Sequence, residues 1–288
     1  KYVFDNTFSK KIISKVNSSN ILKRKKNILT AGPSVSLLEI FNTYKASRYG
    51  WNNNWSDYIE KFEKKFAEYL GVKHALCTSS CTGALQIALL TIGIKKDDEV
   101  IVPDLTWVST ATAVRDLGAK PVFADVELDS WNIDYNSILK KITKKTKAII
   151  VVHLYGHPAR MDKIVKLAKT HNIKIIEDAA PAIGAEWKNK KCGTFGSFAA
   201  FSFQGAKLLV TGEGGMLVTN NTTLYKKAHK IWNQGRNPNI PFWIDEKGLK
   251  FKMSNLQAAF GYAQISRVHE QIQMKRRIFN WYYEKLKK

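Results

Sequence analysis

The sequence predicts an α/β protein with a mostly parallel central sheet and helices on both of its faces. Short apolar segments between turn residues predict strands over residues 75–78, 100–102, 121–124, 148–152, 173–178, 198–203 and 216–219. Segments with helical spacing separate most of these strands. Strands that alternate with helices favour parallel pairing in a sheet that helices cover on both faces.

The predicted helices follow in chain order. The first begins near Ser34 or Ser36, either of which is a suitable N-cap. Residues 58–70 have apolar side chains at helical spacing, and Gly71 ends that helix. Further helices are predicted over residues 79–92, from 106 onward, over 135–142 and 161–170, from 222 to a stop at Gly235, and from 253 to 288. Residues 1–27 are basic, with a candidate helix over 9–16, and are predicted to form an extension without assigned chemistry.

Composition limits the class of protein. A chain of 288 residues that is 44% hydrophobic can bury a substantial core. Its three cysteines lack metal-ligand spacing, which favours a reducing compartment over a disulfide framework. We find no signal peptide and no apolar run of about twenty residues, so the sequence predicts a cytoplasmic protein that does not enter a membrane.

The net charge of +22 predicts an attraction to anionic ligands such as a nucleotide diphosphate sugar. The lysines are spread along the chain, with one dense cluster over residues 23–26. Zinc-finger spacing, RNA-recognition aromatics and a basic region followed by heptads are not found. The sequence therefore does not indicate a nucleic-acid-binding protein.

Lys207 is the first candidate catalytic residue. An apolar strand leads into residues 201–216, where glycines stand on both sides of this single lysine. Glycines let the backbone approach a ligand closely, and the flanking strands exclude water. A lysine in such a position is a candidate former of a Schiff base.

Asp178 is the second candidate. It ends the predicted strand over residues 173–178, and the carboxyl ends of such strands are where open α/β sheets bind ligands. A lysine for the aldehyde and an aspartate for the ring nitrogen are the groups that pyridoxal phosphate (PLP) requires from a protein. Lys207 and Asp178 together predict a PLP site.

Three motifs carry a resemblance to a known family: Glu177-Asp178-Ala179-Ala180, the run from Phe201 through Lys207 to Met216, and Met253-Ser254-Asn255-Leu256-Gln257-Ala258-Ala259. They resemble the DegT/DnrJ/EryC1/StrS sugar aminotransferases from about residue 28 to the C-terminus. The resemblance implies a PLP aminotransferase fold of type I, with a large PLP-binding domain over residues 28–250. It also implies a small helical C-terminal domain that starts at residue 251 and that this chain ends within.

The resemblance also implies roles for other residues. Cys81 and Thr82 would hold the PLP phosphate, at a strand-to-helix junction whose free N–H groups suit an anion. Trp107 would stack on the cofactor ring, and Ser202 belongs to the same set of cofactor-binding residues. Asn233 would reach the PLP phosphate of a neighbouring subunit, which implies a homodimer with a shared active site.

Several residues are candidate substrate contacts. Tyr155 and Glu213 lie near the predicted site, and Arg236 is a candidate for the substrate's phosphates. His153 follows a strand, where it lines the pocket or takes a hydrogen-bonded structural role. Trp51 and Trp55 stand among asparagines in a loop that contacts a sugar or nucleotide, or simply packs onto the body of the protein.

Two positions depart from the family pattern. Cys81 stands where the family often has glycine, and Pro181 stands where it commonly has glutamine beside the ring oxygen of the cofactor. The glutamine's hydrogen bond is then supplied by another group or omitted.

The resemblance implies an aminotransferase that moves an amino group from glutamate, through PLP and its amine form (PMP), to a nucleotide-linked 4-keto-6-deoxyhexose for lipopolysaccharide O-antigen or a related glycan. A 3-keto sugar is the near alternative. Relatives with histidine in place of this lysine are dehydratases, and Lys207 argues against that activity. Two other classes stay open: a catalytically idle PLP fold with a regulatory or nucleic-acid-binding role, and a different PLP enzyme such as a desulfurase or lyase.

Overall fold

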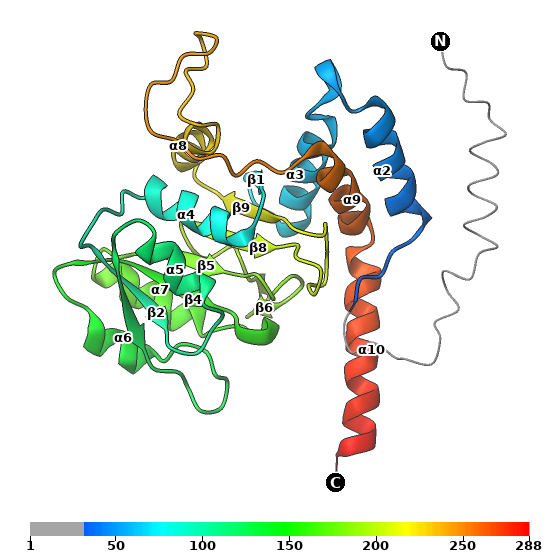
Figure 1. Ribbon diagram of the computed structural model, residues 1–288. Coiled ribbons are helices and arrows are strands. Elements are labelled where there is room, and N and C mark those ends of the chain that lie inside the picture. Colours follow the sequence, from blue (N-terminus) through cyan, green and yellow to red (C-terminus); the bar gives the residue numbers. More distant parts are fainter. Residues whose placement is uncertain (1–31, 288) are drawn as a thin grey trace, which may run out of the picture. The chain divides into compact units, whose positions relative to one another are not determined.

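The computed structural model describes residues 32–287 (Figure 1). The chain divides into two units after Gly32, and the unit that begins at Pro33 holds every element discussed below. The predicted extension over residues 1–27 and its candidate helix lie outside the described residues. The predicted domain start at residue 251 stays a prediction. Within residues 32–287, no helix is long and apolar enough to cross a membrane.

The sheet of this unit has seven strands, all of which the sequence predicts to within two residues at either end. They are β1 (His74–Thr78), β2 (Glu99–Pro103), β3 (Lys120–Ala124), β4 (Thr146–Val152), β5 (Lys174–Asp178), β8 (Phe198–Ser202) and β9 (Gly215–Thr219). Their spatial order is β1-β9-β8-β5-β4-β2-β3. β9 is antiparallel to both of its neighbours and the remaining adjacent pairs are parallel, so the predicted mostly parallel sheet is confirmed.

This topology collects the predicted site residues at one edge of the sheet. Because β1 and β8 are both antiparallel to β9, they run in the same direction as each other and as β5, β4, β2 and β3. The residues at or after these carboxyl ends are Cys81 and Thr82 (β1), Trp107 (β2), His153 and Tyr155 (β4), Asp178 (β5) and Lys207 (β8). The fold thus places the predicted site where open α/β sheets bind ligands.

Helices cover both faces of the sheet (Figure 1). One face packs against α4 (Cys81–Thr91), α5 (Ser109–Arg115) and α8 (Thr222–Trp232). The other face carries two apolar clusters. One joins β2–β5 to α6 (Tyr135–Lys141) and α7 (Met161–Thr170), and the second joins β1, β8 and β9 to α3 (Asp57–Leu70), α9 (Asn255–Ser266) and α10 (Val268–Leu286). Strand residues alternate between the faces, as Val100 and Val102 against Ile101 show.

The ends of the helices follow local sequence signals. Ser36, one of the two predicted caps, begins α2 (Leu37–Tyr49) through a capping box with Glu39. Gly71 ends α3 in the left-handed conformation, as predicted. The helix α8 ends at Trp232, and the predicted stop Gly235 adopts a left-handed φ of 70° and donates its N–H to the Lys230 carbonyl at 2.8 Å.

The C-terminal helical pattern is interrupted rather than continuous. It divides into α9 and α10 at Arg267, whose guanidinium bonds the buried Glu39 carboxylate at 3.1 Å. Glu39 also accepts a hydrogen bond from Gln264 of α9 at 2.9 Å. In Figure 1, α9 lies between α2 and α3, and these polar contacts hold α2 against it.

The sequence analysis missed the small hairpin of β6 (Glu186–Trp187) and β7 (Lys190–Lys191). Two-residue strands are too short to show an alternating pattern. The signal that was available is the Lys188-Asn189 turn, in which both residues adopt the left-handed conformation that such hairpins require.

Candidate active site

Asp178 lies at the centre of the candidate site. It is the last residue of β5 and only 6% exposed. Its Oδ2 atom accepts a hydrogen bond from Thr110 Oγ1 at 2.8 Å, and its Oδ1 atom accepts one from the Ala180 N–H at 3.2 Å. Burial is the largest influence and holds the pKa of this carboxyl above its ordinary value, and the hydrogen bonds and the charge of Lys207 offset part of that rise. Asp178 is therefore a fixed carboxyl with donors that favour its charged form.

Cys81 lies beside Asp178, with its Sγ atom 3.9 Å from Oδ1. Burial raises the pKa of this thiol well above its ordinary value, so the sulfur stays protonated at neutral pH. The side chain of Cys81 faces the carboxylate, and its backbone N–H at the start of α4 is the part available to an anion. The predicted phosphate contact of Cys81 stays a prediction.

Lys207 lies in the loop between β8 and β9, in a turn closed by its own N–H and the Gln204 carbonyl at 2.8 Å. Its charge lowers the pKa values of both Asp178 and Cys81, so Lys207 lies within electrostatic range of both groups. The loop is held at its base, where the Phe203 N–H donates to the Gly214 carbonyl at 2.9 Å. Two distant segments thus bring the predicted lysine and aspartate together.

The start of β9 lies directly against the start of α4. A Cβ atom added to Gly215 would lie 2.5 Å from the Ser80 carbonyl carbon and 2.6 Å from the Cys81 nitrogen. Ser80 caps α4 by accepting the Gly83 N–H at 3.0 Å, and the N–H groups of Cys81 and Thr82 belong to the first turn. The first-turn N–H groups lie at the positive end of α4, where a phosphate can bind.

Trp107 is 77% exposed, although it follows the buried strand β2. It stands three residues before Thr110, and the Trp107 carbonyl accepts the Thr110 N–H at 3.2 Å. Thr110 in turn bonds Asp178. Trp107 is therefore connected to the Asp178 carboxylate through Thr110. The exposed surface of its indole ring is available to a flat ligand.

His153 has a structural environment. It is fully buried, its Nδ1 atom accepts the Ala159 N–H at 3.1 Å, and its Nε2 atom lies 3.1 Å from Glu177 Oε2. Because Nδ1 is an acceptor, Nε2 carries the proton and donates it to Glu177. With both ring nitrogens engaged, the structural role open at the sequence level is favoured over a substrate contact.

Glu177 was quoted in the family motif, but its role was missed. Its carboxylate accepts the backbone N–H groups of Gly193, Phe195 and Gly196 at 2.6 to 2.7 Å, besides the bond from His153. It anchors the segment after β7 to β5, next to Asp178. Thr110 was missed as well, since only its place on the first turn after a strand marked it.

The remaining predicted site residues lie around this centre. Ser202 is buried and pairs with Gly215 across β8 and β9, and Tyr155 is 85% exposed on the loop after β4. Glu213 is exposed in the Lys207 loop, and its carbonyl accepts the Gln257 side chain at 2.8 Å. Asn233 ends α8, and the exposed Arg236 follows it. Their predicted contacts with cofactor, substrate or a second subunit stay predictions.

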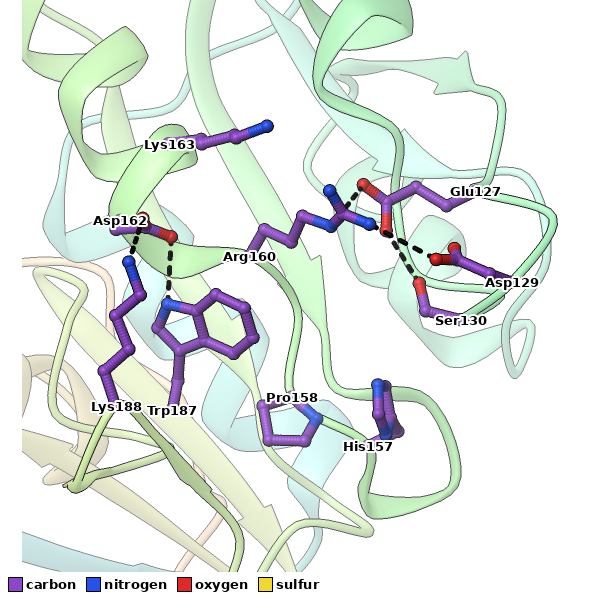
Figure 2. Close-up of a pocket in the computed structure, with 10 residues that line it drawn as sticks. All are labelled: Glu127, Asp129, Ser130, His157, Pro158, Arg160, Asp162, Lys163, Trp187 and Lys188. Atoms are coloured by element: carbon purple, nitrogen blue, oxygen red, sulfur yellow. Dashed lines mark hydrogen bonds and ion pairs between the residues drawn. The ribbon is translucent and has the colours of Figure 1, made fainter.

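A separate hollow of about 340 Å³ lies beyond β3 and β4 (Figure 2). Its lining residues are Glu127, Asp129, Ser130, His157, Pro158, Arg160, Asp162, Lys163, Trp187 and Lys188. Arg160 bonds Glu127 at 3.1 Å and Asp129 at 3.2 Å, so its charge is already compensated. The hollow includes neither Asp178 nor Lys207, and we place the candidate chemistry at those two residues instead.

The residues fit a PLP cofactor. A buried carboxylate, a lysine within electrostatic range of it, an exposed indole and the first-turn N–H groups of α4 suit the ring nitrogen, aldehyde, ring face and phosphate of this molecule. Among residues 32–287, no cluster of three or more His, Cys, Asp or Glu side chains could hold a metal ion.

The order and direction of the strands match the fold of PLP-dependent aminotransferases, as two solved structures show. The aminotransferase from Psychrobacter cryohalolentis superposes with a TM-score of 0.78 at 33% identity, over 84% of this chain and 65% of that one. An E. coli GDP-4-keto-6-deoxy-D-mannose-3-dehydratase with bound hydrated PLP gives 0.83 at 26% identity, over 91% and 73%.

A model of the DegT/DnrJ/EryC1/StrS aminotransferase family matches residues 39–288, and the chain belongs to that family. It is 44% identical to a GDP-perosamine synthase of Caulobacter vibrioides over 236 residues, or 82% of this chain. It is 45% identical to a GDP-perosamine synthase of Escherichia coli O157:H7 over 232 residues, or 81% of this chain. The chain spans 64% of the length of each of these two relatives.

Proposed function

We propose that this protein is a PLP-dependent aminotransferase that moves an amino group from glutamate to a nucleotide-linked keto-deoxysugar. The observation that supports the proposal is that Asp178 ends β5 and Lys207 follows β8 at the same carboxyl edge of the sheet, where the charge of Lys207 lowers the pKa of Asp178. The similarity to GDP-perosamine synthases supports the substrate class.

When bound, PLP supplies a protonated ring that withdraws electrons from a carbanion. Asp178 would accept the hydrogen bond of the ring nitrogen and hold its proton, and the Thr110 hydroxyl keeps the carboxylate oriented. The Lys207 amine would hold the cofactor through its aldehyde and would act as the general base that takes a proton from the donor's α-carbon.

Other residues orient and enclose the cofactor. Trp107 would cover one face of the ring, and the first-turn N–H groups of Cys81 and Thr82 would bind the phosphate together with Ser202. Pro181 has no side-chain donor, so the ring oxygen receives no side-chain hydrogen bond from that position. Asn233 of a second copy would complete the phosphate site, which makes the proposed assembly a homodimer.

The proposed acceptor is a GDP-linked 4-keto-6-deoxyhexose, and the product serves the synthesis of a surface glycan. Support for the 4-keto group comes from a dehydratase whose name specifies GDP-4-keto-6-deoxy-D-mannose and whose fold this chain shares. Tyr155, Glu213 and Arg236 lie on loops around the site and are the proposed substrate contacts.

The first half-reaction tests the proposal directly. Protein loaded with PLP and mixed with glutamate is expected to form a single equivalent of 2-oxoglutarate per site. Lys207→Ala is expected to form none, and Lys190→Ala, which removes an exposed lysine of β7, is expected to match the unmodified protein. Turnover by the Lys207→Ala variant at the rate of the unmodified protein would contradict the assignment of Lys207 as the catalytic lysine. In the second half-reaction, amine-loaded protein and GDP-4-keto-6-deoxymannose are expected to give a GDP-amino sugar by mass spectrometry.

A further inference from the structure

Lys252 forms part of a basic cluster, together with Lys250 and Arg236, beside the rings of Trp55 and Trp232. We propose that this Lys252 cluster binds the diphosphate group of the nucleotide sugar. The inference rests on the proposed function, because it assigns a place to the nucleotide half of that substrate.

The backbone of Lys252 is fixed next to the candidate active site. It forms a bridge with Thr78 at the end of β1, and the Ser79 N–H donates to the Phe251 carbonyl at 2.7 Å. The neighbouring side chains of residues 251 and 253 contact the two parts of that site. A Cβ atom on Gly83 of α4 would lie 2.9 Å from Phe251, and one on Gly214 of the Lys207 loop would lie 2.7 Å from Met253.

The side chain of Lys252 lies between two tryptophans. Its Nζ atom is 4.4 Å from the ring centre of Trp232 and 5.3 Å from that of Trp55. Trp232 is 5% exposed and donates its indole N–H to the Cys77 carbonyl at 2.7 Å, so this ring is held in place. Trp55 is 50% exposed, in a loop that Asn255 holds through the Asn54 carbonyl at 3.2 Å. The ammonium group is thus held on one side by a fixed ring and on the other by a ring open to solvent.

The charges around Lys252 favour an anion. Burial, followed by the charges of Lys250 and Arg236, lowers the pKa of Lys252 to about 8. The group that faces it from α8 is His229, whose own pKa is lowered by burial and by Lys252. Within residues 32–287, no carboxylate forms an ion pair with Lys252, Lys250 or Arg236. A bound dianion would relieve the repulsion among these cations and keep Lys252 protonated.

The acidic residues close in sequence to Arg236 are already paired. Asp245 lies 2.9 Å from Lys230 Nζ, and Glu246 lies 3.6 Å from the same atom. Asp245 also accepts the Asn237 side chain at 3.1 Å. These carboxylates are committed to Lys230 and Asn237, which leaves the Lys252 cluster with an uncompensated positive charge.

A purely structural role for Lys252 predicts a different behaviour. If the cation–π contacts only held the Trp55 loop, replacing Lys252 would change stability and leave anion binding unchanged. Calorimetry of GDP binding to PLP-loaded protein at constant ionic strength distinguishes a purely structural role of Lys252 from a role in anion binding. The measurement needs neither glutamate nor a keto-sugar, so an inactive aminotransferase can still bind GDP. Failure to form 2-oxoglutarate therefore tests the proposed function separately.

The proposal predicts that Lys252→Gln weakens GDP binding about tenfold at pH 7, which is the loss of one charged hydrogen bond. The unmodified protein is expected to lose affinity between pH 7 and pH 9, as Lys252 releases its proton, and the Gln variant is expected to show less of this change. Lys252→Arg keeps the charge at both pH values and is expected to bind GDP at pH 9 as it does at pH 7. Lys141→Gln, an exposed charge on α6, controls for net charge.

The same variants distinguish the nucleotide diphosphate from the cofactor phosphate. Lys252→Gln is expected to bind PLP with unchanged affinity. Equal GDP affinity in the Gln variant and the unmodified protein would overturn the proposal. It would also be overturned if the Gln variant lost PLP affinity and kept GDP affinity, because the anion would then be the cofactor's own phosphate.

Discussion

Thr110 Oγ1 donates a hydrogen bond to Asp178 Oδ2 at 2.8 Å, across 68 residues of sequence, and both side chains are buried. Thr110 stands on the first turn after β2, and Asp178 ends β5. The contact therefore joins the segment that carries Trp107 to the carboxylate expected to face the ring nitrogen. Thr106, one turn earlier, lies 3.4 Å from the same hydroxyl and extends the link.

Thr110→Val is expected to weaken PLP binding about tenfold. The hydroxyl stabilises the charged form of Asp178, so its removal raises the pKa of this carboxyl further above its ordinary value. The pH below which PLP affinity falls should therefore move upward, as measured by fluorescence titration across pH 5 to 9. Thr110→Ser keeps the hydroxyl and is the control. A valine variant with the affinity and pH profile of the serine variant would show that the hydrogen bond does not matter.

Gly215→Ala is expected to destabilise the protein by about 1–3 kcal/mol and to weaken PLP binding, because its Cβ atom would lie 2.5 Å from the backbone of Ser80. The matched control is Gly205→Ala in the loop that precedes β9, where the nearest atom to an added Cβ is 3.9 Å away. Urea denaturation and PLP titration measure the two effects. Similar losses in both variants would show that the contact with Ser80 is not the cause.

Glu63→Gln is expected to stabilise the protein at pH 8 and to change little at pH 4.5. Burial raises the pKa of Glu63 to about 7, from an ordinary value of 4.5. The folded state therefore holds this proton more tightly than the unfolded chain. The stability it contributes is present below pH 4.5 and is lost as the pH rises through 7. Thermal unfolding across this range is expected to show a gain of about 3 kcal/mol at pH 8. Glu68→Gln, on the exposed side of the same helix, controls for charge.

Replacement of His153 tests its structural assignment. His153→Ala removes the acceptor of the Ala159 N–H and a donor to Glu177, and is expected to cost about 2–3 kcal/mol of stability. The fraction of the His153→Ala variant that remains folded is expected to bind GDP with unchanged affinity. Tyr155→Ala, on the exposed part of the same loop, is expected to leave stability nearly unchanged. If the His153 variant had normal stability and impaired ligand binding, His153 would be a substrate contact rather than a structural residue.

The sequence predicts the sheet well because each strand is a local apolar segment between turn signals. It predicts Asp178 and Lys207 because strand ends in open α/β sheets gather at one edge, where a lysine and an aspartate have a known joint use. Other features depend on distant partners. Thr110 is a common residue until Asp178 lies beside it, and Lys252 is one of many lysines until Trp55 and Trp232 flank it. The buried position of His153 likewise depends on Glu177, which its own neighbours in sequence do not reveal.

The antiparallel strand β9 has a consequence for how the site assembles. Because β8 and β9 are adjacent in both sequence and space, pairing of Ser202 with Gly215 closes the Lys207 loop by a short-range event with a small entropic cost. Asp178 acquires its Thr110 partner only after the crossovers between β2 and β5 have formed. The Lys207 amine is thus positioned by contacts between segments close in sequence, whereas Asp178 is positioned by contacts between segments far apart in sequence. Insertions in the distant crossover loops should be tolerated without moving the amine, whereas any change in length between β8 and β9 would displace it directly.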